Sequence, residues 1–187
     1  MGKFLTGKAR LQQTDRKRYW RLLDNEIYKD DNGDIHITPR NMLSDNYTIP
    51  LWIDLLVGSP VDFDTRCCHL HDLQCYSHET LIVTLTEEEL IKKGYLRYSE
   101  KNKMWICEDI PPKFLILRKI SKLGANNMLF RSMKAAGVSL WDRIKVRLGV
   151  VFNLNWFIYK WLKKTFELDL ERIYDENFWQ EHVKNWS

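Results

Sequence analysis

The sequence predicts an α+β fold in which N-terminal antiparallel β-hairpins pack against a helical C-terminal half. Up to about residue 107, short apolar runs flank turn sequences, whereas from residue 113 the apolar residues recur at helical spacing. The chain has 187 residues, of which 44% are hydrophobic and 29% charged. This size and composition are typical of one water-soluble domain.

Three segments are expected along the chain. Residues 1–17 form a basic N-terminal arm, residues 18–150 a single α+β core domain, and residues 151–187 an aromatic, amphipathic helical extension. Residues 1–22 hold seven basic side chains against one acid, and residues 165–187 hold six acids against two bases. A basic arm can bind nucleic acid, anionic lipid or an acidic face of a neighbouring subunit, or it can stay solvated.

The first hairpin is predicted over residues 18–39, around the turn sequence DNGD at 31–34. Asn-Gly readily adopts the positive φ angles that a tight hairpin turn requires. Residues 35–38 alternate between apolar and polar side chains, which predicts a strand with one buried face. His36 is then expected to face solvent or a neighbouring strand.

Local sequence patterns predict a short helix and a second hairpin between residues 86 and 107. Thr86 and Glu89 match a capping box and predict a short helix over 86–93 that stops at Gly94. Residues 95–107 alternate around a polar turn and predict a second hairpin.

The C-terminal half is predicted to be helical. One helix is expected from about 113 to 136, closed by Gly137, and another from Ser139 to about 164. A last amphipathic segment covers residues 169–184.

Membrane insertion and secretion are not indicated by the sequence. The most apolar stretch, residues 148–162, is interrupted by Asn153, Asn155 and Lys160, and it is shorter than the roughly 20 residues that a bilayer requires. The N-terminus lacks the apolar core of a signal peptide. We therefore expect synthesis in the cytoplasm and no transmembrane segment.

The stretch 67-CCHLHDLQCY-76 concentrates chemically active side chains in a predicted helix over residues 65–80. Four of them fall at i, i+3, i+4 and i+7 and therefore share one stripe of that helix: Cys68, His71, Asp72 and Cys75. His69 and Gln74 point elsewhere. The four cysteines of the chain are expected to stay reduced, and a closed zinc site is disfavoured because Cys107 alone lies outside the cluster.

An adjacent His-Asp pair admits two interpretations. In the first, His71 is a general base and Asp72, joined by Asp45, binds a hard cation such as Ca²⁺. In the second, both side chains satisfy each other and nearby backbone groups within the fold. A site of Asp45, His71 and Asp72 requires these residues to converge from separate segments.

The spacing C-C-x-x-H-D-x-x-C resembles the active-site helix of the secretory calcium-dependent phospholipases that cleave the sn-2 ester. The resemblance implies that His71 is the base and that Asp72 is a calcium ligand. It covers about nine residues, and the glycine-rich calcium loop and the many other cysteines of those enzymes are missing.

A longer resemblance spans about residues 18–150. The motifs 44-SDNYTIP-50, His71-Asp72 and 126-NNMLFRSMKAAGVSLW-141 are similar to a family of tailed-phage and prophage proteins, domain of unknown function 1353. Its pattern runs T-D-L-A-S-V-P, then H-D-x-x-Y, then A-D-x-x-F-x-x-A-M-x-x-x-G-V. Asn127 is expected at the aspartate position of the third motif, and Tyr76 lies one residue after the tyrosine position of the second.

The family resemblance implies a phage protein made in the cytoplasm of a host bacterium. Such a protein is either a virion component of the tail or baseplate, assembled with other phage structural proteins, or a lysis or host-takeover factor. The residues expected to mediate interactions are Trp156, Tyr159 and Trp161 of the extension and Arg16, Lys17 and Arg18 of the arm.

Three functional hypotheses follow. The first is a phage structural or interaction protein that retains the His-Asp pair as part of its fold. The second is a calcium-assisted hydrolase of a lipid ester or a cell-wall substrate, with His71 as base and with Asp72 and Asp45 as ligands. The third is nucleic-acid binding by the basic arm, where arginines and lysines are interspersed with aromatic residues.

Overall fold

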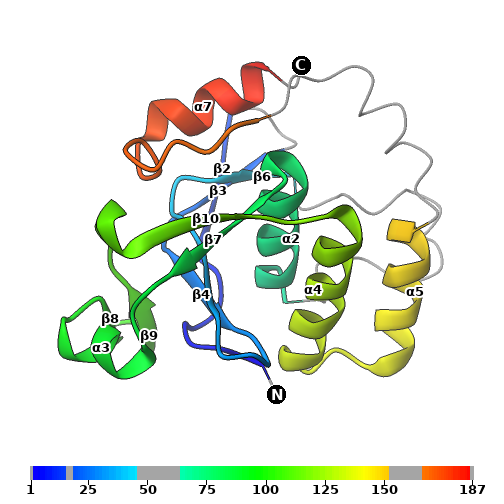
Figure 1. Ribbon diagram of the computed structural model, residues 1–187, viewed down its shortest axis with the longest axis horizontal. Coiled ribbons are helices and arrows are strands. Elements are labelled where there is room, and N and C mark those ends of the chain that lie inside the picture. Colours follow the sequence, from blue (N-terminus) through cyan, green and yellow to red (C-terminus); the bar gives the residue numbers. More distant parts are fainter. Residues whose placement is uncertain (1, 16–18, 46–63, 152–165, 186–187) are drawn as a thin grey trace.

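The computed structural model describes residues 2–15, 19–45, 64–151 and 166–185. The predicted α+β class is confirmed. Antiparallel sheets occupy the N-terminal half of the chain, and most of the helices lie in the C-terminal half (Figure 1).

The main sheet is five-stranded and antiparallel, with the strand order β1-β4-β5-β7-β10. Its strands are β1 (Lys3–Phe4), β4 (Glu26–Lys29), β5 (Ile35–Thr38), β7 (Glu79–Val83) and β10 (Leu115–Lys119). The predicted first hairpin is confirmed as β4–β5. All four residues of β5 are buried, so the expectation of one buried face was wrong, because β5 is the central strand and both of its faces are covered.

Two smaller sheets flank the main one. A three-stranded sheet has the order β2-β3-β6, with β2 (Leu11–Gln13), β3 (Trp20–Leu22) and β6 (Leu43–Ser44). The predicted second hairpin is confirmed as β8 (Leu96–Ser99) and β9 (Met104–Cys107). Strands β1 and β2 lie within residues 1–17, so the described part of the expected arm belongs to the core sheets.

Helices α2 (Arg66–Ser77), α4 (Lys122–Ala135) and α5 (Leu140–Val151) pack side by side in that order (Figure 1). The α4–α5 contact is apolar and includes Leu129, Met133, Val146 and Val150. Helix α2 lies between α4 and the main sheet. It is the element that carries the His-Asp pair.

Helix α3 (Glu87–Lys92) confirms the predicted capping box. The Thr86 hydroxyl accepts from the Glu89 N–H, and the Glu89 carboxylate accepts from the Thr86 N–H. Gly94 follows with a φ of 77°, a left-handed conformation in which glycine carries no Cβ penalty.

The predicted helix over 113–136 is only partly correct. Residues 112–114 form the short 3₁₀ helix η2 (Pro112–Phe114), residues 115–119 form β10, and only then does α4 begin, with Ser121 as its N-cap. In β10, Leu115 and Leu117 point inward and alternate with the exposed Ile116 and Arg118. This period of two is that of an edge strand with one face on the core.

The C-terminal segment also belongs to the core. Helix α7 (Glu176–Lys184) buries Phe178 and Trp179 in the main hydrophobic cluster, and the indole N–H of Trp179 donates to the Ile173 carbonyl at 2.7 Å. The expected boundary at residue 151 therefore does not separate residues 166–185 from the core. Among the described residues, no helix is long and apolar enough to cross a bilayer.

Candidate functional site

Helix α2 is enclosed on several sides, and this determines what its polar residues can do. It contacts β5 and β7 of the main sheet, helix α4 and strand β6. Its buried residues therefore include polar ones: His69, His71, Asp72, Gln74 and Ser77. Buried polar groups require partners inside the protein. His69, His71, Asp72 and Gln74 each bind a side chain from a different strand or helix.

Asp72 joins α2 to strand β6. Its side chain is fully buried, and its Oδ2 accepts a hydrogen bond from the Ser44 hydroxyl at 2.5 Å. Asp45, the next residue after Ser44, is also buried. The structure thus brings the segment that carries Asp45 to the helix that carries Asp72, as the sequence analysis required.

The carboxylates of Asp72 and Asp45 both raise the pKa of two neighbouring side chains, Cys68 and Tyr76. Burial raises the pKa of the Cys68 thiol, and Asp72 and Asp45 raise it further. Burial likewise raises the pKa of Tyr76, and the same two carboxylates add to that shift. Cys68 and Tyr76 therefore stay protonated in this negative environment.

The described residues around Asp72 do not include three side chains placed to bind one metal ion. Among the described residues, only one group of at least three His, Cys, Asp or Glu side chains has ligand atoms within 4.8 Å of one another, and it is Asp30, Asp34 and His36. The expected set of Asp45, His71 and Asp72 does not form such a group.

His71 contacts helix α4. It is 5% exposed, and its Nε2 lies 3.1 Å from the Oδ1 of Asn126. Because an amide oxygen only accepts, this contact places a proton on Nε2. The Nδ1 lies 4.0 Å from the Asp72 Oδ1, too far for a hydrogen bond.

Cys75 lies against the same imidazole, one helical turn after His71. Its Sγ is 3.3 Å from the His71 Nε2 and 3.9 Å from the Nδ1, and the residue is only partly buried. Burial by itself lowers the pKa of His71, but Cys75 and Asn126 outweigh burial and raise it. A negative charge at Cys75 therefore stabilises an imidazolium at His71.

Lys122, at the start of α4, is near the same pair. Burial lowers the pKa of its ammonium group, and a negative charge on Cys75 opposes that shift. Cys75 lies on the predicted stripe of His71, but the sequence alone assigned it no role. The i, i+4 spacing of the two residues was the available signal.

His69 and Gln74 point away from the stripe of His71, as predicted, and both contact the main sheet. The Nδ1 of His69 lies 3.1 Å from each carboxylate oxygen of Glu26 on β4. Burial lowers the pKa of His69, but Glu26 outweighs it and the net direction is upward. Gln74 donates from Nε2 to the Thr80 hydroxyl on β7 at 3.1 Å.

Asn127 contacts helix α5 and does not contact His71. Its Oδ1 lies 3.5 Å from the Arg147 Nη2 on α5, whereas the preceding residue, Asn126, faces His71. Residues one apart on a helix point about 100° apart, so only one of the two asparagines can face α2.

Basic residues near the N-terminus form ion pairs within the chain. Lys3 pairs with Glu87 at 2.8 Å, Arg10 pairs with Asp24 at 2.5 Å, and Arg21 pairs with Glu176. The last pair joins the basic N-terminal region to the acidic C-terminal one inside a single molecule. The expected interaction residues Arg16, Lys17, Arg18, Trp156, Tyr159 and Trp161 lie outside the described residues.

All four cysteines are free. Comparison of the chain with family models, with curated proteins and with solved structures gives no match.

Proposed function

We propose that the protein is a phage-encoded structural or interaction protein, of the virion tail or baseplate class, in which the His71–Asp72 pair holds the fold together. The observation that carries this proposal is the enclosure of Asp72. Its side chain is fully buried, and Oδ2 is occupied by the Ser44 hydroxyl. A carboxylate in this position joins β6 to α2 and is poorly placed to ligate a cation beside a substrate.

The position of Asn126 supports the same proposal. If the family pattern is aligned on Met133 and Gly137, its aspartate falls on residue 126, which faces His71. A neutral amide in place of a carboxylate weakens the binding of a hard cation. The phage origin itself rests on the resemblance of the three motifs, and it implies synthesis in the host cytoplasm and assembly with other phage proteins.

Helix α5 provides a surface suited to a protein partner. Leu140, Trp141 and Leu148 are 56%, 74% and 50% exposed, while Val146 and Val150 of the same helix pack in the cluster shared with α4. Exposed tryptophan and leucine side chains are favoured at protein contacts. The proposed occupant is a neighbouring subunit of the assembly. In the sequence, this helix leads directly into the segment that contains Trp156, Tyr159 and Trp161.

Mass photometry of the purified protein with phage lysate fractions, together with proteomics of purified particles, tests this proposal. The protein should appear in particles or in a defined complex. The double variant Trp141→Ala/Leu148→Ala should lose that association and keep the melting temperature of the wild type. Tyr98→Ala/Trp105→Ala is the matched control, because these residues form an exposed aromatic pair on the β8–β9 hairpin. Absence from particles and from every stable complex would contradict the proposal.

A hydrolase that uses His71 as general base is the second candidate, and the contact with Cys75 favours a thiol rather than a cation as its partner. In this reaction the Cys75 thiolate attacks the acyl carbon of an ester or amide, and the His71 imidazolium gives its proton to the leaving group. Water activated by the neutral imidazole then hydrolyses the thioester and restores the thiol.

Hydrolysis assays on lipid-ester and cell-wall substrates decide between the two candidates. The thiol mechanism predicts activity without added Ca²⁺ and its loss in both Cys75→Ala and His71→Ala. The calcium-assisted mechanism predicts loss in His71→Ala but not in Cys75→Ala, together with dependence on Ca²⁺. Equal rates in the wild type and both variants would exclude a hydrolase based on this pair.

A further inference from the structure

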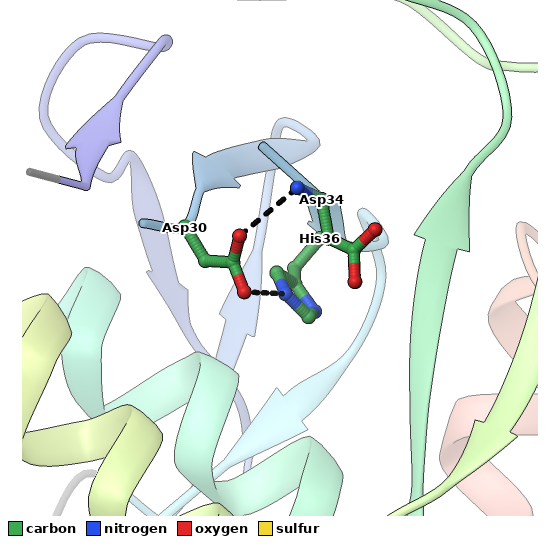
Figure 2. A group of neighbouring side chains, drawn as sticks. All are labelled: Asp30, Asp34 and His36. Atoms are coloured by element: carbon green, nitrogen blue, oxygen red, sulfur yellow. Dashed lines mark hydrogen bonds and ion pairs between the residues drawn. The ribbon is translucent and has the colours of Figure 1, made fainter. Parts of the chain in front are cut away.

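The turn of the β4–β5 hairpin gathers three side chains that can bind a metal ion. Asp30 follows β4, Asp34 precedes β5, and His36 lies within β5. One ligand atom from each lies within 4.8 Å of the other two. Figure 2 shows the imidazole of His36 and the carboxylates of Asp30 and Asp34 gathered at the end of the hairpin.

The turn holds the Asp30 carboxylate in place through the backbone. Its Oδ1 accepts from the N–H of Asn32 at 2.8 Å and from the N–H of Asp34 at 2.9 Å. Gly33 has a φ of 92° and donates its N–H to the Asp30 carbonyl at 3.2 Å, which closes the turn. Oδ1 is therefore engaged. Oδ2 accepts a long hydrogen bond from the Asn32 Nδ2 at 3.4 Å and faces the imidazole of His36 (Figure 2).

His36 is positioned from its other ring nitrogen. Its Nδ1 lies 2.9 Å from the Thr80 hydroxyl on β7, and that hydroxyl also accepts from Gln74 of α2. A hydroxyl oxygen has two lone pairs, so it can accept from both Gln74 and an Nδ1–H of the imidazole. In this tautomer Nε2 carries a bare lone pair. A metal-binding histidine commonly has this arrangement, in which its second nitrogen donates to a protein oxygen.

The Nε2 of His36 is buried and has no hydrogen-bond partner. The side chain is 3% exposed, and the nearest Asp30 oxygen is 3.5 Å away, beyond the 2.7–3.2 Å of an N–H···O hydrogen bond. His69 provides an internal contrast, since its buried nitrogen lies 3.1 Å from both oxygens of Glu26 and hydrogen-bonds to them. At His36, Nε2 instead faces the Asp30 Oδ2 without a hydrogen bond, and in the tautomer whose Nδ1–H donates to Thr80 both of these facing atoms are acceptors.

Either a proton or a metal cation could relieve this contact between two acceptors. Burial lowers the pKa of His36 and outweighs the neighbouring Asp30 carboxylate. A neutral imidazole is the form that binds metal ions. Asp34, with a side chain that is 34% exposed, leaves the site open to solvent on one side.

We propose that Asp30, Asp34 and His36 form a binding site for a divalent transition-metal ion of the zinc or manganese type. The ligands are the Asp30 Oδ2, an Asp34 carboxylate oxygen and the His36 Nε2, and water completes the coordination on the side of Asp34. The imidazole ligand favours zinc over Ca²⁺ and Mg²⁺, which prefer oxygen ligands only, and the two carboxylates also suit manganese. Arg118 pairs with the Asp34 Oδ2 at 2.5 Å, so the other oxygen of Asp34 is the one free to bind the ion.

Titration of the chelator-treated, full-length protein with Co²⁺, Mn²⁺, Zn²⁺ and Ca²⁺ tests this site. Calorimetry should show one bound transition-metal ion per chain, and the melting temperature should rise with its concentration. Co²⁺ should give a visible d–d spectrum without a thiolate charge-transfer band. A thiolate band would place the ion at the cysteines of α2 and overturn the proposal, as would Ca²⁺ binding as tight as that of Mn²⁺.

Two variants of the same turn separate ligation from general negative charge. Asp34→Asn removes a ligand and should weaken transition-metal binding by about tenfold or more. Asp31→Asn removes the same charge one residue from Asp30, at a carboxylate whose Oδ1 accepts from the Gly2 N–H at 2.5 Å. It should change the affinity by less than about twofold, because exposed charges contribute little. Equal losses in the two variants, or no binding by the wild type, would overturn the proposal.

His36→Gln provides a second test that is independent of the charge. It retains a polar side chain and should abolish the d–d spectrum of Co²⁺, and circular dichroism establishes that the variant is folded. If His36→Gln misfolds, the Asp34→Asn and Asp31→Asn comparison decides alone. A folded His36→Gln that binds Co²⁺ like the wild type would overturn the assignment of the imidazole as a ligand.

Discussion

Removing the hydroxyl of Ser44 is the sharpest test of a fold-holding role for Asp72. The Ser44 Oγ donates to the Asp72 Oδ2 at 2.5 Å, and the Asp72 side chain is fully buried. Hydrogen bonds to charged groups contribute about 1.5–3 kcal/mol, and a buried carboxylate that loses a donor keeps its desolvation cost. Ser44→Ala should therefore lower the free energy of unfolding by about 2–3 kcal/mol.

Urea denaturation followed by circular dichroism measures this loss. At about 2–4 °C per kcal/mol for a chain of this size, the melting temperature should fall by roughly 4–12 °C. Ser139→Ala is the control, because Ser139 donates to Asp142 at 2.6 Å in an exposed position near the start of α5. That variant should cost about 1 kcal/mol, the usual effect of losing a helix cap.

A double-mutant cycle with Asp72→Asn isolates the charge in this hydrogen bond. In the Asp72→Asn background the bond is between neutral groups, so Ser44→Ala should cost only about 0.5–1.5 kcal/mol. If Ser44→Ala costs the same in both backgrounds, or costs less than the exposed control, Asp72 does not hold β6 on α2. The proposed fold-holding role would then fail.

Three further predictions concern other parts of the molecule. The pKa of His69 is raised in the folded state, so its charge stabilises the fold below about pH 6.5, and this contribution is lost as the pH rises through the folded pKa. Urea denaturation at several pH values should therefore show that the stability difference between the wild type and His69→Gln shrinks as the pH rises. A difference that grows with pH would contradict this prediction. Iodoacetamide should label Cys75 before Cys67, because burial raises the pKa of Cys67 to about 12. Equal labelling of the two cysteines by peptide mass spectrometry would contradict the prediction that the Cys75 thiol is the more accessible one. Trp179→Ala should lower the free energy of unfolding by about 3–5 kcal/mol, because the buried indole donates to the Ile173 carbonyl. A loss below about 1 kcal/mol, the range of surface changes, would indicate that residues 166–185 are an appended extension and not part of the core.

Elements defined by chemistry between sequence neighbours could be predicted from the sequence. The β4–β5 turn requires the positive φ of Gly33, and the start of α3 requires the reciprocal bonds of Thr86 and Glu89. Both patterns lie within four residues. They therefore appear in the sequence whatever the rest of the chain does.

Elements that depend on distant partners could not be predicted in the same way. Strand β1 forms because Lys3 and Phe4 pair with Lys29 and Tyr28, about 25 residues away. Residues 115–119 become a strand because they pair with β7, even though their apolar residues also suit a helix. In both cases, pairing with a distant strand overrides the local pattern.

Only part of the candidate site could be predicted from the sequence, because the rest depends on partners that are distant along the chain. The helical stripe of His71, Asp72 and Cys75 follows from spacing alone. The partners Ser44 and Asn126 come from β6 and α4, and only the folded structure identifies them.

The two candidate sites are connected through α2. Gln74 binds the Thr80 hydroxyl, which in turn binds the Nδ1 of His36, so the helix that carries His71 and Asp72 also sets the orientation of His36. A metal ion at the Nε2 of His36 therefore favours the tautomer in which Nδ1 donates to Thr80. In that tautomer the Thr80 oxygen accepts from both side chains, which joins α2, β5 and β7 through one atom. Metal binding at the hairpin is for this reason expected to stabilise the packing of α2 on the sheet, and not the turn alone.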